Sequence, residues 1–311
     1  MEYKRLASTD LIVSCIGFGC WGIGGHGYGD VDDSESIRAV RKALDCGVNF
    51  FDTADVYGFG HSEEVLGKAL GSQRNKVIVA SKFGVAWDEN CNTYKDCSAK
   101  RIASALEGSL RRLKTDCIHL YQIHWHDGKT PIDGVMEALL RCRDTGKLLH
   151  IGCCNFSREL LSNACSKHEI VSYQCLYNLA KRENEDIIEY SSKDLGISVL
   201  AYSVIGRGVF SAKHDKNTQF ARNDTRAKDY DFLGARYRDN ILIAKRLREI
   251  GKRYGKSGAQ VAIRWVLENP HITCALTGIK NRKQVSENVG ALGWSLDKND
   301  IELIDSMISR G

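Results

Sequence analysis

Residues 118–154 read IHLYQIHWHDGKTPIDGVMEALLRCRDTGKLLHIGCC, and this stretch decides the fold class. Two short apolar runs, Ile118–Ile123 and Leu149–Cys153, flank the amphipathic stretch Ile132–Thr145. Pro131 suits the entry of a helix, and Gly146 suits its end because glycine tolerates a positive φ. The pattern therefore predicts a strand, a helix and a second strand, the unit that joins parallel strands.

The same alternation can be followed along almost the whole chain. The other predicted strands are Ile16–Gly19, Asn49–Asp52, Val77–Ser81, Val171–Gln174, Ser198–Ala201 and Cys274–Leu276. The other predicted helices are Ser34–Cys46, Ser62–Leu70, Ser98–Leu113, Arg158–Ser166, Glu185–Leu195, Ile241–Tyr254 with Ser257–Asn269, and Gln284–Ala291. A hairpin, Tyr3–Val13, precedes these units, and a final helix, Lys298–Ser309, closes the chain. Because no break in composition divides the units, the α/β pattern predicts one (β/α)8 TIM barrel domain over residues 1–311.

The composition excludes several other classes of protein. Hydrophobic residues make up 43% of the 311 residues and only two residues are proline, so proline-rich linkers are excluded. The net charge is +5 without any aromatic-interleaved basic stripe, so we expect no nucleic-acid partner. The twelve cysteines follow no zinc or C-x-x-C pattern, and neither a signal-peptide core nor a membrane-length apolar run occurs. We therefore expect a reduced, cytoplasmic protein with no membrane partner and no bound metal.

Glycines near the N-terminus match a nucleotide-binding pattern that we reject. Gly17, Gly19 and Gly22 form a G-x-G-x-x-G sequence directly after the first strand of the barrel. In dinucleotide-binding folds the third glycine begins a helix that meets the pyrophosphate. Here the next predicted helix begins only near Ser34, so we interpret the glycines as part of a flexible loop over the barrel mouth.

The segment 206–239 is too long for an ordinary loop and is predicted to be a lid. Between Lys213 and Arg238 it carries four aspartates and seven basic residues, Lys213, Lys216, Arg222, Arg226, Lys228, Arg236 and Arg238. This charge favours either a mobile flap that attracts an anionic ligand or a plain solvated loop, and the sequence leaves both open.

Four polar residues are predicted to meet at one rim of the barrel. Asp52 and Lys82 end or follow consecutive strands, His124 follows the next strand, and Tyr57 lies five residues after Asp52. Alone, Asp52 would be interpreted as a helix cap and Tyr57 as a rim residue. Together they suit proton donation to a developing alkoxide: a phenol has a pKa near 10, a neighbouring ammonium favours phenolate, and a carboxylate holds that ammonium. His124 would hydrogen-bond the same substrate oxygen.

Three further side chains are predicted near this rim. Trp21 and Trp125 are interpreted as walls of a substrate pocket, with packing in the core as the open alternative. His126 is interpreted as a substrate-pocket or rim residue. His124 and His126 could also be a metal pair, but no third ligand follows at a suitable spacing, so we favour the pocket.

The motifs together resemble the aldo-keto reductase superfamily, most closely the bacterial general-stress and inositol-operon type reductases, and more distantly the potassium-channel beta subunits. The resemblance rests on Gly17–Trp21, Asp52–Gly58, Ser81–Lys82, Leu120–His124, Ile151–Phe156, Gln174 with Tyr177–Asn178, Ala201–Ser203 and Glu287–Asn288. It implies that Asp52, Tyr57, Lys82 and His124 are the catalytic tetrad, with Tyr57 as general acid, and that NADPH/NADP+ is the cofactor.

The resemblance also implies a set of cofactor-binding residues. They are Gly19, Trp21, Cys154, Asn155, Gln174, Tyr202, Ser203, Val204, Gly206, Gly208, Lys280, Gln284, Glu287 and Asn288. Within this set, Asn155 and Gln174 are placed on the nicotinamide carboxamide, and Lys280 on the 2′-phosphate. The chain departs from the family where Cys154 replaces the usual serine and Val204 a usual proline, which implies a looser grip and a less rigid loop.

These inferences predict an NADPH-dependent enzyme that reduces a small-molecule aldehyde or ketone, a keto-sugar among the candidates, to the alcohol. The alternative is a low-turnover NADP(H)-binding module that senses redox state, which the channel-subunit resemblance allows. A metal-dependent barrel hydrolase is a third class, and it would require a bound metal.

Overall fold

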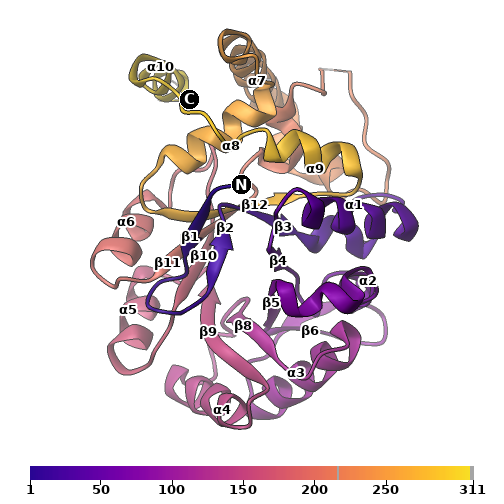
Figure 1. Cartoon of the computed structure of the whole chain (residues 1–311), viewed down its shortest axis with the longest axis vertical. Coiled ribbons are helices and arrows are strands. Elements are labelled where there is room, and N and C mark those ends of the chain that lie inside the picture. The colour runs from indigo at the N-terminus through magenta and orange to yellow at the C-terminus, as the bar shows by residue number, and fades with distance from the viewer. Residues whose placement is uncertain (216, 309–311) are drawn as a thin grey trace.

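The structure is a computed structural model that describes residues 1–215 and 217–308, and these residues form a closed barrel of eight parallel strands. Around the barrel the strands follow the order β10, β11, β12, β3, β4, β5, β8 and β9. Their bounds are β3 Ile16–Gly19, β4 Phe50–Asp52, β5 Ile78–Phe83, β8 Ile118–Ile123, β9 Leu148–Cys154, β10 Ser172–Leu176, β11 Ser198–Tyr202 and β12 Ile272–Gly278. Helices surround this ring of strands (Figure 1). The predicted (β/α)8 barrel is therefore confirmed.

The helices lie close to the predicted ranges. They are α1 Asp33–Asp45, α2 His61–Leu70, α3 Ala99–Leu113, α4 Ile132–Asp144, α5 Arg158–Lys167, α6 Glu185–Lys193, α7 Gly234–Tyr254, α8 Gly258–Glu268, α9 Arg282–Val289 and α10 Lys298–Ile308. Ser98 caps α3 as predicted, because its hydroxyl accepts a bond from the Arg101 N–H at 3.3 Å. Ser34 does not cap α1; it lies in the first turn and donates its N–H to Asp32, the actual cap, at 2.8 Å. The predicted end of the last helix, Ser309, lies outside the described residues.

The predicted N-terminal hairpin is present and closes one end of the barrel. Strands β1 (Tyr3–Arg5) and β2 (Ile12–Ser14) pair antiparallel, and Figure 1 shows them in front of the ring of strands. Leu6 and Val13 of this hairpin are fully buried and join the apolar interior of the barrel, which includes Phe50, Leu120 and Leu200. The interior of the barrel is thus packed from this end, and a cavity opens at the carboxyl ends of the strands.

Two parts of the structure differ from the sequence-based expectation. A second hairpin, β6 (Val85–Trp87) with β7 (Thr93–Lys95), follows β5, and its turn is held by the Asp88 carboxylate, which accepts N–H groups of Asn90 and Asn92. Helix α7 begins at Gly234 and not at the predicted Ile241. The prediction missed the first two turns because they are polar and carry no apolar periodicity.

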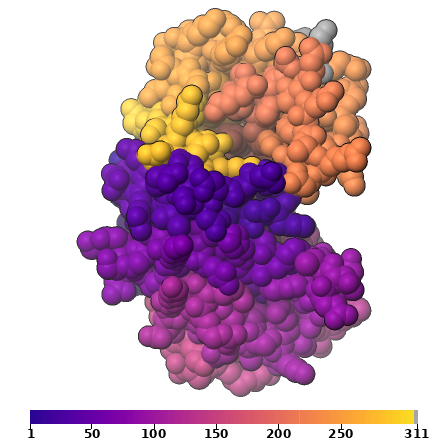
Figure 2. All heavy atoms as spheres, turned by 90° about the vertical axis from the view of Figure 1, so that its right-hand side faces the viewer, coloured from indigo at the N-terminus to yellow at the C-terminus, as the bar shows by residue number. Residues whose placement is uncertain are grey.

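The segment 206–239 contains local structure of its own. It holds three short 3-10 helices, η3 (Gly206–Ser211), η4 (Thr225–Lys228) and η5 (Tyr230–Phe232), and the start of α7, while the predicted flap residue Lys216 lies outside the described residues. Thr225 N–H donates to Gly27 O at 3.0 Å. Figure 2 shows this orange segment against the indigo N-terminal part of the chain.

A helix that spans a membrane must be both long and apolar. Within residues 1–215 and 217–308, no helix is both long enough and apolar enough to cross a membrane.

Candidate active site

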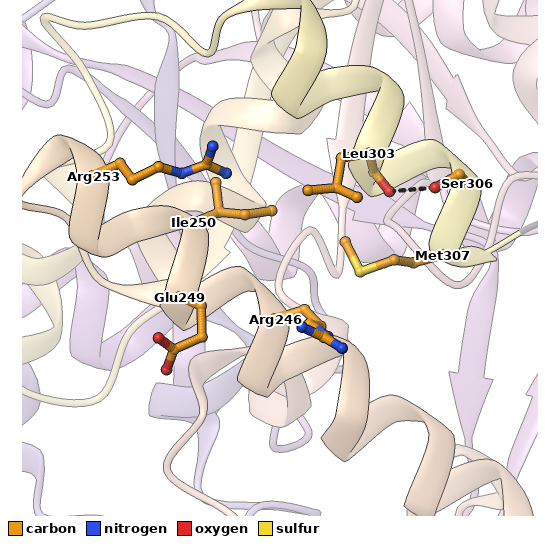
Figure 3. A pocket seen from close by; sticks show the side chains of 7 residues that line it. All are labelled: Arg246, Glu249, Ile250, Arg253, Leu303, Ser306 and Met307. Carbon is orange, nitrogen blue, oxygen red and sulfur yellow. Dashed lines mark hydrogen bonds between the residues drawn. The ribbon is translucent and has the colours of Figure 1, made fainter.

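A cavity of about 490 Å³ lies between α7 and α10, away from the strand ends (Figure 3). Its lining consists of Arg246, Glu249, Ile250, Arg253, Leu303, Ser306 and Met307. Arg253 is already paired with Asp300, and Ser306 donates to Leu303 O at 2.8 Å. None of the predicted site residues lines this cavity.

A larger cavity, of about 750 Å³, opens at the carboxyl ends of the barrel strands. Strand-end residues that line it include Gly19, Asp52, His124, Asn155, Gln174, Tyr202 and Gly278. Other lining residues come from the loops and from α9, and they include Trp21, Tyr57, Trp125, Lys280 and Asn288. The cavity thus lies at the end of the barrel where the sequence analysis expects the site.

An ammonium, a carboxylate and a phenol meet on the floor of this cavity. Lys82 Nζ lies 2.5 Å from Asp52 Oδ1, 2.8 Å from Thr53 O and 3.4 Å from Tyr57 Oη. Lys82 is fully buried and Asp52 nearly so. Because Asp52 ends β4 and Lys82 belongs to the neighbouring strand β5, parallel pairing brings both side chains to one place.

The loop after β4 has a fixed course that places Tyr57. Gly58, the next residue, has a φ of 59°, in the left-handed region that favours glycine. A Cβ at Gly58 would lie 2.0 Å from the carbonyl oxygen of Gly24, so the two loops approach backbone to backbone. The Trp21 ring stacks near the Tyr57 ring at 6.1 Å between centroids.

The pKa values of Tyr57 and Lys82 follow from burial and from each other. Burial raises the pKa of Tyr57 above its ordinary value, and the nearby Lys82 ammonium only partly opposes this. Burial acts against the charged form of Lys82, but the Asp52 carboxylate, with Tyr57, outweighs it and raises the pKa of Lys82. At neutral pH the pair is a protonated phenol beside an ammonium.

His124 completes the group of four predicted residues. Its ring is nearly perpendicular to the Tyr57 ring, with centroids 5.6 Å apart. Burial, and then the charge of Lys82, hold the pKa of His124 well below its ordinary value, so the imidazole is neutral at pH 7. Its Nδ1 has no hydrogen-bond partner among residues 1–215 and 217–308.

Two glutamines hydrogen-bond the Asp52 carboxylate. Gln122 Nε2 donates to Asp52 Oδ2 at 3.1 Å, and Gln174 Nε2 donates to the same oxygen at 2.9 Å. Gln122 was missed by the sequence analysis, although a fully buried amide in an apolar strand requires a polar partner. The Cys154 thiol lies behind these groups, 3.7 Å from Gln122 Oε1, and burial raises its pKa.

Asn155 and Tyr202 form one side of the cavity. The Tyr202 hydroxyl donates to Asn155 Oδ1 at 2.9 Å, and Asn155 Nδ2 donates to His124 O at 3.2 Å. Asn155 and Ser203 both have positive φ, of 59° and 56°. The Ser203 carbonyl is held by Asn178 Nδ2 at 3.0 Å, so the backbone that follows β11 is anchored.

The far end of the cavity is basic. Lys280 Nζ donates to Tyr28 O, and the charge of Arg226 acts on Lys280 electrostatically. Burial, and then Arg226, lower the pKa of Lys280. Arg207, which the sequence analysis missed, lies 5.2 Å over the Trp21 ring and pairs with Asp229.

Comparison with known proteins identifies the family. The model of the Aldo/keto reductase family matches residues 15–309. The chain belongs to this family. It is 36% identical to aldo-keto reductase YhdN of Bacillus subtilis (strain 168), over 99% of this chain and 94% of that protein. It is 33% identical to the uncharacterized oxidoreductase YrpG of the same organism, over 99% of this chain and 96% of that protein.

Solved structures of aldo/keto reductases agree with this assignment. The glycerol dehydrogenase AKR11B4 from Gluconobacter oxydans has a TM-score of 0.91 and 35% identity, covering 99% of this chain and 95% of that chain. The holo form of aldo-keto reductase AKR11C1 from Bacillus halodurans has a TM-score of 0.82 and 27% identity, covering 99% and 96%. The chain is thus an oxidoreductase of the aldo/keto reductase family.

Most of the predicted site residues of this aldo/keto reductase line the one cavity. They include Trp21 and Trp125, so the alternative of core packing does not hold for either. The predicted residues outside the lining are Lys82, which lies beneath Tyr57, and Cys154, Gly206 and His126.

His126 differs from its predicted position in the substrate pocket. Its ring faces that of Phe156 at 6.0 Å between centroids, and its Nδ1 accepts the Gly128 N–H at 3.1 Å. His126 lies beyond the end of β8 at Ile123, and the alternation of side-chain directions holds only within a strand. The spacing from His124 therefore does not direct His126 toward the cavity. His126 does not line the cavity, and its Nε2 is buried without a hydrogen-bond partner among the described residues.

Proposed function

We propose that this protein reduces an aldehyde or ketone to the alcohol with NADPH, and that Tyr57 is the general acid. The observation that carries the proposal is the contact of a protonated phenol, Tyr57, with the Lys82 ammonium, which Asp52 holds in turn. A reduction needs a proton at the carbonyl oxygen as negative charge develops there.

The lining of the cavity supports nicotinamide adenine dinucleotide phosphate as the proposed cofactor. It extends from Tyr57 to Lys280, and its basic end suits phosphate groups. Near that end the buried Asn288 Nδ2 has no partner within the described chain, so a polar donor is left for a ligand. When bound, the cofactor supplies the hydride.

Each part of the cofactor has residues suited to hold it. Asn155 and Gln174 carry amides for the carboxamide, and Tyr202 offers a ring face for the nicotinamide. Ser203, Gly206 and Gly208 suit the pyrophosphate, and Gly19, Trp21, Cys154 and Val204 complete the predicted set. Lys280, Gln284, Glu287 and Asn288 suit the adenosine end, and all four line the cavity.

The chain's own groups can complete the reduction. Tyr57 Oη donates its proton to the substrate oxygen, and the Lys82 ammonium stabilises the phenolate that remains. Asp52, fixed by Gln122 and Gln174, keeps Lys82 charged and in place. The neutral His124 donates or accepts a hydrogen bond without adding charge.

Replacement of the phenol tests this assignment. Tyr57→Phe should lower turnover with NADPH about 10²- to 10⁴-fold, because the proton donor is lost while little volume changes. The Kd for NADPH should stay within about threefold of wild type. Lys82→Met should also lower turnover, and Tyr94→Phe, which removes an exposed phenol, should not.

A panel of carbonyl compounds provides the assay. It should include aldoses, keto-sugars, methylglyoxal and aromatic aldehydes, and, because one relative is named a glycerol dehydrogenase, glycerol with NADP+ in the reverse direction. Substantial activity in Tyr57→Phe would contradict the assignment of the general acid. Tight NADPH binding with negligible turnover on the whole panel would favour the low-turnover sensing module.

A further inference from the structure

Asp55 is a buried carboxylate that the proposed mechanism does not use. It lies in the loop between β4 and α2, two residues before Tyr57, and it is 0% exposed. Its Oδ2 accepts a hydrogen bond from Arg101 Nη2, while Oδ1 has no partner among the residues that the structure describes. A charged group in this position must have a structural or functional reason, because burial of a carboxylate is costly.

Arg101 joins this loop to a second element. From α3 its guanidinium contacts Asp55 and also donates to Val85 O, in the β6–β7 hairpin, at 3.3 Å. The same guanidinium lies 5.3 Å from the centre of the Trp87 ring, and Trp87 packs against Phe59 of the Tyr57 loop at 5.8 Å. One side chain thus links the loop that carries the general acid to the hairpin.

The hairpin forms a wall of the cavity near Tyr57. Val85 lines the cavity, and so do Cys91 and Thr93 of the same hairpin. Phe59 and Trp125 line it as well. The hairpin pairs only with itself in the described sheets, so its position relative to the barrel depends on its continuation from β5 through Gly84 and on side-chain contacts such as those of Arg101.

Stability alone is a weak explanation for the pair. Burial raises the pKa of Asp55 to about 7 even though the Arg101 charge opposes this, so desolvation outweighs the attraction between the two groups. Buried pairs of this kind are weak evidence for stability, and a role in fixing one arrangement is an established alternative.

We propose that Asp55 and Arg101 are positioning residues that hold the Tyr57 loop and the β6–β7 hairpin in one arrangement, and so fix the width of the cavity beside the general acid. The proposal rests on the reductase function proposed above. It predicts that loss of either side chain affects the carbonyl substrate much more than NADPH, because the cofactor-binding residues lie on other elements.

The test combines kinetics with hydrogen exchange. In Asp55→Asn and Arg101→Met, kcat/KM for a bulky aromatic aldehyde should fall about ten- to hundredfold, since small displacements of catalytic groups have such effects. The Kd for NADPH should change less than about threefold. In the protein without cofactor, amides of residues 85–97 should exchange about tenfold faster. The double variant should be no worse than the poorer single variant, because both changes break one contact.

Glu63→Gln is the matched control. Glu63 is also fully buried, pairs with Arg112 of α3 and accepts a bond from Ser81 at 2.5 Å, and no hydrogen bond or ion pair joins its side chain to the hairpin among the described residues. Its charge acts on Asp55, so Glu63→Gln changes the electrostatics around Asp55 but leaves the Arg101 contact in place. It should lower the midpoint of thermal unfolding without faster exchange in residues 85–97. Arg101→Lys keeps the charge but loses the planar guanidinium donors, so its kcat/KM and its exchange rates should lie between those of wild type and Arg101→Met. This variant also provides a test if Asp55→Asn does not fold.

The two proposals fail in different ways. If wild type turns over no carbonyl, the reductase function is wrong, and the exchange measurement still tests the positioning pair. If wild type is active and the variants match it in kcat/KM and in exchange, the positioning role is wrong. Equal exchange increases in Glu63→Gln and Asp55→Asn would also overturn it, because the effect would then be general loosening.

Discussion

Lys280 illustrates how one side chain is prepared for a charged ligand. Its backbone N–H donates to Gln284 Oε1 at 2.7 Å, and its Nζ donates to Tyr28 O, so both ends of the residue are fixed. Arg226 lies near enough to lower the pKa of Lys280 further after burial has lowered it. Arg282, two residues on, is engaged by Glu35 of α1 and does not line the cavity. An anion that approaches Lys280 would relieve repulsion between two cations.

We therefore expect Lys280→Met to weaken NADPH binding at least about tenfold, because a charge-assisted contact to the 2′-phosphate is lost. NADH binding should stay within about threefold, and the Kd for NADPH should depend less on salt. Fluorescence titration with both reduced cofactors measures this. Lys283→Met makes the same change in charge three residues further on, in the first turn of α9 and outside the cavity lining, and should affect neither cofactor. Equal losses for NADPH and NADH in Lys280→Met would contradict the assignment.

The convergence of Asp52, Lys82 and His124 could be predicted from the sequence because each lies at or just after the end of a strand, and parallel strands end at one rim. Gln122 and Arg207 could not be identified in the same way. The role of Gln122 depends on the register of β8 against β5 and on which oxygen of Asp52 it meets. Arg207 reaches Trp21 across 186 positions of sequence, and only tertiary packing brings the two together.

At the scale of elements, long periodic helices and apolar strands were predictable, whereas short polar elements were not. The β6–β7 hairpin has three residues in each strand and depends on the Asp88 turn, so it offers too little alternation to recognise. The first turns of α7 face partly to solvent, and Gly234 with a φ of 59° gives no helical signal. Local chemistry and tertiary contacts, and not periodicity, determine both elements.

The segment 206–239 is tied to the loop after β3 at several points. Thr225 N–H and hydroxyl both reach Gly27 O, at 3.0 and 2.9 Å, and Asn223 Nδ2 donates to Asp30 at 3.2 Å. Arg226 pairs with Asp224 and lines the cavity. The electrostatic role predicted for this segment would therefore act through Arg226 toward the cofactor, and its mobility remains a prediction.

Limited proteolysis tests that role at the scale of the segment. NADPH should slow tryptic cleavage after Lys213, Arg222 and Arg226 at least about threefold, because a ligand that contacts the segment stabilises its folded form against local unfolding. Cleavage after Lys129, on an exposed loop outside the cavity lining, should be unchanged. Mass spectrometry identifies the fragments. Cleavage in the segment that NADPH does not slow would leave the solvated loop as the correct interpretation.

At the scale of the whole molecule, one end of the barrel is filled with apolar side chains, and the other end holds the polar residues of the candidate site. Leu6 and Val13 fill the end under the N-terminal hairpin, next to inward-facing residues of the strands. At the opposite end the inward-facing side chains become polar, and Asp52, Gln122 and Gln174 form one network. The hydrogen bonds within this network offset the cost of burying its polar groups inside an apolar barrel.

Asp55 makes the free energy of unfolding depend on pH, and this contribution can be separated from those of other titrating groups. Its pKa is raised to about 7 in the folded protein, whereas an unfolded chain has an aspartate pKa near 4. The folded state therefore binds this proton more tightly, and the resulting stability is fully present below about pH 4 and is lost as pH rises through about 7. The charged and titratable groups that act on Asp55 are Arg101 and Arg112 of α3, Glu63 of α2, and Tyr121 of β8.

Comparison of wild type with Asp55→Asn removes the other titrating groups from the measurement. His124, whose pKa is lowered by burial, favours the folded state above the unfolded histidine pKa and loses that contribution as pH falls, but it does so in both proteins. The free energy of unfolding is measured by urea titration at each pH for both proteins. Between pH 5 and pH 8 the value for wild type should decrease by about 3 kcal/mol more than the value for Asp55→Asn. A difference between the two proteins that stays constant over this range would show that Asp55 is already ionised at pH 5, held by Arg101 more strongly than burial opposes it.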